Sequence, residues 1–186
     1  IISVLAWIEF YALVSKIFTK NNLTQKVLRF FLKTLSLLYL SILVYFVLIT
    51  TFASIVLKTY LFYSILVSVL SDIGGLIVGK IVKGKKLTNI SPNKTVSGSV
   101  GSFIFALSLI PFFSKYFYLY DLSSLIIITI LISLTSQLGD LFISLLKRKA
   151  NVEDTSNLLP GHGGILDRID GIIFAIPMGF LLFSIL

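Results

Sequence analysis

The feature that most constrains the fold is a succession of long apolar segments. We place six of them at residues 1–18, 30–57, 59–82, 96–113, 122–146 and 169–186. Several approach the ~20 residues that a helix needs to cross ~30 Å of hydrocarbon. Their apolar runs are unbroken rather than alternating, which predicts helices and disfavours a β-barrel. We therefore predict an all-α, polytopic integral membrane protein with about six transmembrane helices.

The positive charges are distributed unevenly along this pattern. The net charge is +8, with 16 Lys and Arg against 8 Asp and Glu. All of the basic residues except Lys58 and Lys115 lie around the first, third and fifth connections between the segments. Such alternation is typical of cytoplasmic loops, with anionic lipid headgroups as partners. We therefore expect membrane lipids rather than nucleic acid to be the partners, and both ends of this sequence to face the opposite side.

Two further properties bound the chemistry. The sequence has no cysteine, which excludes disulfides, thiolate metal sites and a cysteine nucleophile. Its first residue is Ile rather than Met, so we expect residues to precede it.

Two aspartates lie inside otherwise apolar helices. Ionisable residues there are costly and usually face a polar cavity or a partner. Asp140 shares a helical face with Gln137, Ser144 and Lys147, because their spacing is 3, 4 and 3 residues. Asp72 begins a similar stripe, which continues with two glycines. A functional site and a buried acid paired with lysine for packing both remain open.

Both stripes lead into basic residues. Gly75 and Gly79 follow Asp72 and would let another helix approach closely. The other stripe ends in Lys147-Arg148-Lys149, a cluster suited to phosphate. In the loop 91–95, Ser-Pro-Asn-Lys-Thr, Lys94 could contact phosphate or could simply be a topogenic lysine in a turn.

The stretch 160–170, Pro-Gly-His-Gly-Gly-Ile-Leu-Asp-Arg-Ile-Asp, is polar within this apolar sequence. Its glycines permit backbone conformations that turn N–H groups toward anions. Asp167 and Asp170 share a face if the last helix begins there, and carboxylates together with phosphate oxygens commonly hold Mg²⁺. Arg168 can clamp phosphate. His162 could be a base, but a loop residue that only forms hydrogen bonds is the more common case.

A family resemblance rests on these motifs. The quoted elements are Ser144-Leu-Leu-Lys-Arg148, Glu153-Asp154, Ser156, Leu159-Pro160, His162-Gly-Gly164 and Asp167-Arg-Ile-Asp170, preceded by Gln137-Leu-Gly-Asp140, Asp72-Ile-Gly-Gly75 and Ser91-Pro-Asn-Lys-Thr95. In order and spacing they resemble the signature of bacterial phosphatidate cytidylyltransferases, also called CDP-diacylglycerol synthases. The likeness covers about Leu66 to the C-terminus.

The sequence departs from the family pattern at three places. Glu153 stands where the family usually has Lys, and Ser97 stands where it usually has Glu. Ile73-Gly74-Gly75 replaces a usual Thr-Gly-Ala. The change at Glu153 removes a plausible phosphate contact, which bears on substrate affinity rather than on the type of reaction.

The resemblance implies the formation of CDP-diacylglycerol and pyrophosphate from CTP and phosphatidate in phospholipid biosynthesis, with Mg²⁺ and allowance for a second metal ion. It implies metal binding by Asp140 and Asp167, and a catalytic set that adds Lys147 and Arg168. We expect the substrates to be bound by Asp72, Lys94, Ser144, Arg148, His162, Gly163, Gly164 and Asp170.

The same resemblance sets expectations for organisation and place. Residues 1–186 would form a single transmembrane catalytic domain that lacks N-terminal helices of the family, with the signature at 140–170. The domain would lie in the bacterial inner (cytoplasmic) membrane with a cytoplasm-facing site, and a homodimer is allowed.

Three alternatives remain. A related CTP-using lipid kinase or an ether-lipid cytidylyltransferase would share the motifs. A non-enzymatic transporter is disfavoured, because its charged residues should follow a path across the membrane, whereas the polar motifs here cluster on one side.

Overall fold

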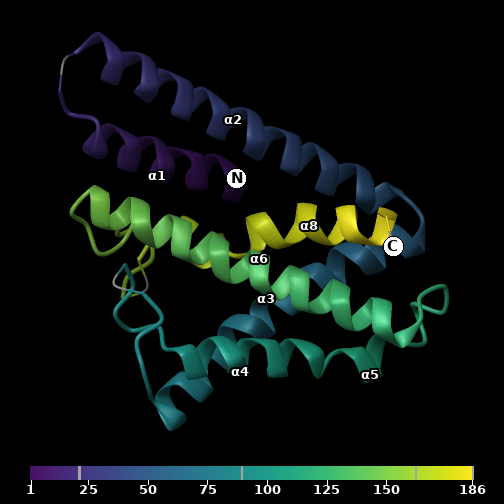
Figure 1. Ribbon diagram of the computed structural model, residues 1–186. Helices are drawn as coiled ribbons and strands as arrows, with labels where there is room; N and C mark the ends of the chain where they lie inside the picture. The colour runs from purple at the N-terminus through teal and green to yellow at the C-terminus, as the bar shows by residue number, and fades with distance from the viewer. Residues whose placement is uncertain (21, 89, 162, 186) are drawn as a thin grey trace.

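The computed structural model describes residues 1–20, 22–88, 90–161 and 163–185, and these residues form an all-helical bundle (Figure 1). The helices are α1 (Ile2–Ile17), α2 (Leu23–Phe52), α3 (Ile55–Val82), α4 (Val96–Leu107), α5 (Ile110–Phe113), α6 (Leu122–Lys149), α7 (Leu166–Ile169) and α8 (Ile172–Ile185). Among the described residues, β pairing is limited to two isolated bridges. The predicted all-α class is confirmed.

Five segments are long and apolar enough to cross a membrane. They are Leu23–Phe52, Ile55–Val82, Val96–Phe113, Leu122–Lys149 and Leu166–Ile185. The fourth and sixth predicted segments are each divided between two helices, namely α4 with α5 and α7 with α8. The first predicted segment is α1, whose 16 residues rise roughly 24 Å, short of the ~30 Å hydrocarbon core. Within the described residues, five segments thus have the length and composition of a span and α1 is shorter, which agrees with the prediction of about six transmembrane helices.

The predicted limits of the second and third segments were wrong. α2 begins at Leu23 rather than at residue 30, and it ends at Phe52 rather than at residue 57. The third segment begins at Ile55 instead of residue 59. Ser54 is the single polar residue in 53–57, so hydropathy does not mark the turn between the helices. At the start of α2, the basic residues of the first turns lower the local hydropathy of the sequence, but they do not oppose helix formation.

The interior of the bundle combines large apolar side chains with small and hydroxyl-bearing ones, and large apolar side chains also cover the exterior. α3, α6 and α8 pack against one another, α4 covers α3 and α6, and α1 contacts α2, α6 and α7. Between α3 and α6, hydroxyl pairs join Ser68 to Ser136 and Ser71 to Ser133, each at 2.7 Å. Many large apolar side chains face outward; that of Phe112, for example, is 75% exposed. Lipid as the surrounding solvent accounts for this distribution, and the protein is a membrane protein.

Glycines allow α3 and α4 to pack at very short range. A Cβ added at Gly74 would lie 2.6 Å from the carbonyl oxygen of Gly101, and a Cβ at Gly98 would lie 2.8 Å from the carbonyl oxygen of Gly75. The predicted close approach at Gly75 and Gly79 is confirmed. This contact fixes the spacing of the two helices where they border the cavity described below.

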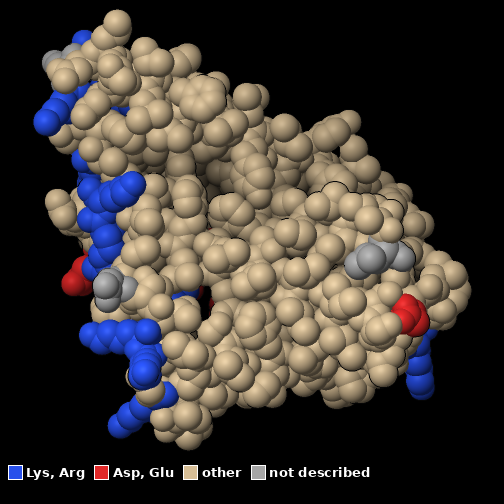
Figure 2. All heavy atoms as spheres, in the orientation of Figure 1, with Lys and Arg blue, Asp and Glu red and all other residues tan. Residues whose placement is uncertain are grey.

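The connections α1–α2, α3–α4 and α6–α7 lie together at one end of the bundle, at the left of Figure 1. Figure 2 shows that Lys and Arg side chains gather along this end, which we call the basic end. The C-terminal end of α8 lies at the opposite end. The clustering expected from the alternation of charge along the sequence is therefore present in space.

Candidate active site

A cavity of about 570 Å³ lies among α3, α4, α6 and α7 near the basic end. Four aspartates and three basic residues line it, together with small and amide side chains. The charged lining residues are Asp72, Asp140, Asp167, Asp170, Lys80, Lys94 and Arg168. Residues from four separate sequence motifs thus meet around one space.

Asp140 projects from α6 and forms an ion pair with Lys94. Lys94 is positioned by a turn in which its N–H donates to the carbonyl oxygen of Ser91 at 3.1 Å. The hydroxyl of Ser144, one turn along α6, donates to Asp140 Oδ1 at 3.3 Å. Gln137, one turn earlier, also lines the cavity and accepts a hydrogen bond from Ser99 at 2.6 Å. The polar stripe predicted on this helix is therefore real.

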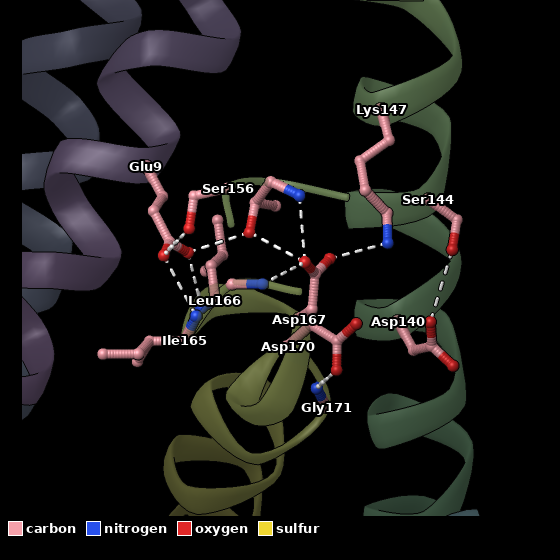
Figure 3. A network of polar contacts seen from close by, with 12 residues as sticks. Glu9, Asp140, Ser144, Lys147, Ser156, Ile165, Leu166, Asp167, Asp170 and Gly171 are labelled. Carbon is pink, nitrogen blue, oxygen red and sulfur yellow. Dashed lines mark hydrogen bonds and ion pairs between the residues drawn. The ribbon is translucent and has the colours of Figure 1, made fainter. Parts of the chain in front are cut away.

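Asp167 stands in a dense set of donors and its side chain is only 7% exposed (Figure 3). Lys147 Nζ lies 2.6 Å from Asp167 Oδ1. The other oxygen, Oδ2, accepts the N–H of Thr155 at 2.9 Å, the hydroxyl of Thr155 at 2.8 Å and the N–H of Gly164 at 3.0 Å. Fixed donors on several sides hold this carboxylate in one orientation.

The glycines of the loop serve this arrangement. Gly163 has φ of +81°, a conformation that other residues rarely adopt. A Cβ on Gly164 would lie 2.5 Å from Glu9 Oε2, so only glycine allows this carboxylate to approach. The loop was expected to turn N–H groups toward an anion, and the N–H of Gly164 does so, with Asp167 of the protein itself as the acceptor.

The remaining predicted residues divide into two groups. Asp72, Asp170 and Arg168 line the cavity, and the buried Asp170 also accepts the N–H of Gly171 at 2.9 Å. Arg148 is not among the described lining residues; its Nε donates to the carbonyl oxygen of Ile90 at 3.3 Å. Among the described residues, Lys147, Ser144, Gly163 and Gly164 likewise contact neighbouring residues rather than line the cavity. His162 lies outside the described residues.

One residue of the network was not assigned any role from the sequence. Glu9 of α1 is buried beneath the loop and accepts hydrogen bonds from it (Figure 3). The signal that could have found it was visible, because a carboxylate in an apolar helix needs a polar partner. The partner lies about 150 positions away, which no local pattern reveals.

The lining is chemically suited to a hard cation. Carboxylate oxygens are the ligands that Mg²⁺ prefers, usually one or two carboxylates completed by phosphate oxygens and water. Within the described part of the chain, no group of three or more His, Cys, Asp or Glu is placed to hold a metal by itself. The four aspartates of the lining offer carboxylate oxygens of the kind that Mg²⁺ takes together with phosphate oxygens and water.

Fold and cavity together define a helical membrane protein with an acidic and basic site near one end of its spans. The chain matches the model of the Cytidylyltransferase family over residues 1–186, and it belongs to this family. It is 42% identical over 135 residues to the phosphatidate cytidylyltransferase of Bacillus subtilis, a match that covers 68% of this chain and 48% of that protein.

Two other relatives show a similar level of identity. The phosphatidate cytidylyltransferase of Staphylococcus haemolyticus is 42% identical over 122 residues, covering 64% of this chain and 46% of the relative. That of Rickettsia bellii is 44% identical over 119 residues, covering 60% and 52%. The chain spans about half the length of the curated relatives it matches.

Proposed function

We propose that the protein transfers a cytidylyl group from CTP to phosphatidate, giving CDP-diacylglycerol and pyrophosphate. The observation that carries this proposal is the meeting of Asp140, Asp167 and Lys94 at one cavity near the basic end, with Lys147 paired to Asp167, in a chain of the Cytidylyltransferase family. The relatives are phosphatidate cytidylyltransferases, which supports the choice of phosphatidate as acceptor.

The proposed step is a single displacement at phosphorus. A phosphate oxygen of phosphatidate forms a bond to the α-phosphorus of CTP, and the bond from that phosphorus to the bridging oxygen of the β-phosphate breaks. Pyrophosphate leaves with the electron pair. The attacking oxygen is already anionic, so no base must remove a proton. Such transfer depends mainly on positioning and on neutralisation of charge.

The residues of the cavity can supply both. Asp140 and Asp167 would hold Mg²⁺, which when bound neutralises charge on the phosphates. In the structure each of these carboxylates faces a lysine, Lys94 for Asp140 and Lys147 for Asp167. The lysines are thus close enough to turn toward phosphate groups that enter the cavity. Arg168, which also lines the cavity, offers a planar set of donors for phosphate.

The wall of the cavity explains how a lipid could take part. Leu76 lines the cavity and is 63% exposed on the apolar surface of α3. The cavity wall therefore reaches a surface that would face lipid. The phosphate of phosphatidate can enter there while its acyl chains stay in the bilayer, so the site needs no deep tunnel for them.

The proposal includes the place of the enzyme. Positive charge at cytoplasmic loops is the general rule for membrane proteins, and the cavity lies near the basic end. We therefore place the site on the cytoplasmic side of the bacterial inner membrane, where CTP is available.

A product assay on the full-length protein in lipid nanodiscs tests the function. CTP labelled in the cytosine ring should yield labelled CDP-diacylglycerol, and CTP labelled at the γ-phosphate should yield labelled pyrophosphate in equal amount. A CTP-dependent lipid kinase would instead release CDP and label the lipid from the γ-phosphate. That outcome, or no consumption of CTP with phosphatidate in the bilayer, would reject the proposal. Replacing phosphatidate by its ether analogue tests the remaining alternative.

A further inference from the structure

Glu9 is a buried carboxylate for which the proposed transfer has no use. It lies in the middle of α1 and is 2% exposed. Among the described residues, neither of the two ion pairs involves it. An unpaired buried charge is costly unless hydrogen bonds replace its water. The hydrogen bonds of Glu9 therefore indicate its role in the structure.

Four donor groups lie around the carboxylate, two at each oxygen, and one of them, the Thr155 hydroxyl, shares its single proton between Glu9 and Asp167. Oε1 accepts the hydroxyl of Ser156 at 2.6 Å and the N–H of Ile165 at 3.0 Å. Oε2 accepts the hydroxyl of Thr155 and the N–H of Leu166, both at 2.8 Å. Four acceptor positions are the full capacity of an ionised carboxylate. The site is therefore matched to a carboxylate rather than to an amide.

The donors come from the two ends of one loop. Residues 155–156 form its start and residues 165–166 its end, and the segment between them carries the glycines next to Asp167. Glu9 of α1 thus contacts both ends of the loop from one side, as Figure 3 shows.

The same loop ends hold Asp167. The hydroxyl of Thr155 lies 2.8 Å from Glu9 Oε2 and 2.8 Å from Asp167 Oδ2, so one side chain contacts both carboxylates. The N–H of Gly164, directly before the two amides bound by Glu9, donates to Asp167. Any shift of the loop away from Glu9 would therefore move two donors of Asp167 with it.

We propose that Glu9 is a positioning residue, which pins both ends of the loop 155–166 to α1 and thereby fixes the Asp167 carboxylate at the cavity. Its role in turnover rests on the proposed function, whereas its role in ordering the loop does not. Glu9 would touch neither substrate nor metal, and it acts through Thr155 and the loop backbone.

The variant Glu9→Gln tests this, because it keeps the size of the side chain but replaces one acceptor oxygen by a donor. Amide hydrogen exchange should be measured residue by residue. Exchange should rise at Ile165 and Leu166, which Glu9 binds directly, by at least about tenfold. The diagnostic result is a similar rise at the Thr155 and Gly164 amides, which Asp167 binds and Glu9 does not.

Kinetics supply a second reading. A misplaced reacting group can cost on the order of 100-fold. Glu9→Gln should therefore lower kcat by about 10-fold to 100-fold and raise the Mg²⁺ concentration for half-maximal rate, with KM for phosphatidate little changed. Asn157→Ala is the matched control, because it shortens an exposed side chain of the same loop and should change neither reading.

The two proposals can fail separately. If the wild-type protein does not convert CTP and phosphatidate, the proposed function is wrong, and the exchange measurement still decides the role of Glu9. If Glu9→Gln leaves the Thr155 and Gly164 amides as protected as in the wild type, the positioning role is rejected. Should Glu9→Gln not fold, Ser156→Ala removes one of the four donors and must show the same spread of exchange in weaker form.

Discussion

The two aspartates assigned to the metal sit in different surroundings. The side chain of Asp140 is 27% exposed, and it forms one ion pair and one long hydrogen bond with the hydroxyl of Ser144. Asp167 is 7% exposed and surrounded by donors from three residues. The first carboxylate is therefore available to a ligand with little loss to the fold, whereas the second also organises a loop. Their replacement should have different consequences.

Asp140→Asn is expected to lower kcat/KM for CTP by at least about 100-fold while leaving thermal unfolding unchanged. Losing several kcal/mol of charge stabilisation corresponds to two or more factors of ten in rate. Steady-state kinetics over a range of Mg²⁺ concentrations measure the effect. Asp121→Asn is the control, because Asp121 is an exposed carboxylate at the other end of α6. Near-normal rates of Asp140→Asn at limiting Mg²⁺ would show that this residue does not hold the metal.

Asp167→Asn should be inactive and also less stable. The amide would present a donor to at least one of the groups that now donate to the carboxylate, and an unsatisfied buried donor costs about 1–3 kcal/mol. Unfolding by heat or denaturant in detergent should therefore begin earlier than for Asp140→Asn. Equal stability of the two variants would contradict the difference in environment seen in the structure.

The sequence could predict residues whose partners are near in sequence or recur in a family motif. The stripe of Gln137, Asp140 and Ser144 followed from helical spacing alone, and the structure confirms it. The contact of Arg148 with the Ile90 carbonyl could not be foreseen, because loop conformation decides where a long side chain ends. Glu9 was missed for the same reason at longer range, since its donors follow from tertiary packing.

At the scale of elements, α3 and α4 carry the most specific contact of the bundle. Their glycines give no amphipathic signal, yet Gly74 and Gly101 lie at the point of closest approach. The sequence could predict that small residues allow close packing of α3, but it could not identify α4 as the partner. Breaks between helices were also hidden where only one polar residue interrupts an apolar stretch, as Ser54 does between α2 and α3.

Gly101→Leu is expected to separate α3 from α4 and to destabilise the protein by about 1–3 kcal/mol, because overpacking forces the backbone to shift. A Cβ at this position would already overlap with Val78. Thermal unfolding in detergent measures the loss. Val100→Leu adds volume at the neighbouring, outward-facing position and should have little effect. If both variants unfolded at the wild-type temperature, the close helix contact would be wrong.

For the whole molecule, the organising feature is that charge, motifs and cavity share one end of the helices. The basic end holds the α3–α4 and α6–α7 connections, and both contribute to the candidate site or its supports. This arrangement was predictable, because the positive-inside rule and the alternation of spans require only composition and order. The position of the cavity among these helices, with Leu76 in its wall, could not be predicted, because it depends on how the helices pack.

The sidedness can be measured with single cysteines, since the sequence has none of its own. Lys86→Cys, in the exposed α3–α4 connection, should resist a membrane-impermeant maleimide in intact cells and react after the inner membrane is opened. Lys115→Cys, exposed between α5 and α6 at the opposite end, should react in intact cells once the reagent reaches the periplasm. Five spans from α2 to α8 require this difference, because α4 and α5 together cross the membrane between the two positions.

A membrane-permeant maleimide should label both variants equally and so exclude unequal burial as the cause. Labelling of both positions in intact cells, or of neither, would place the two connections on one side and would overturn the arrangement of spans. Labelling of Lys86→Cys but not of Lys115→Cys in intact cells would keep the spans but place the candidate site on the periplasmic side. The proposed use of CTP could not hold there.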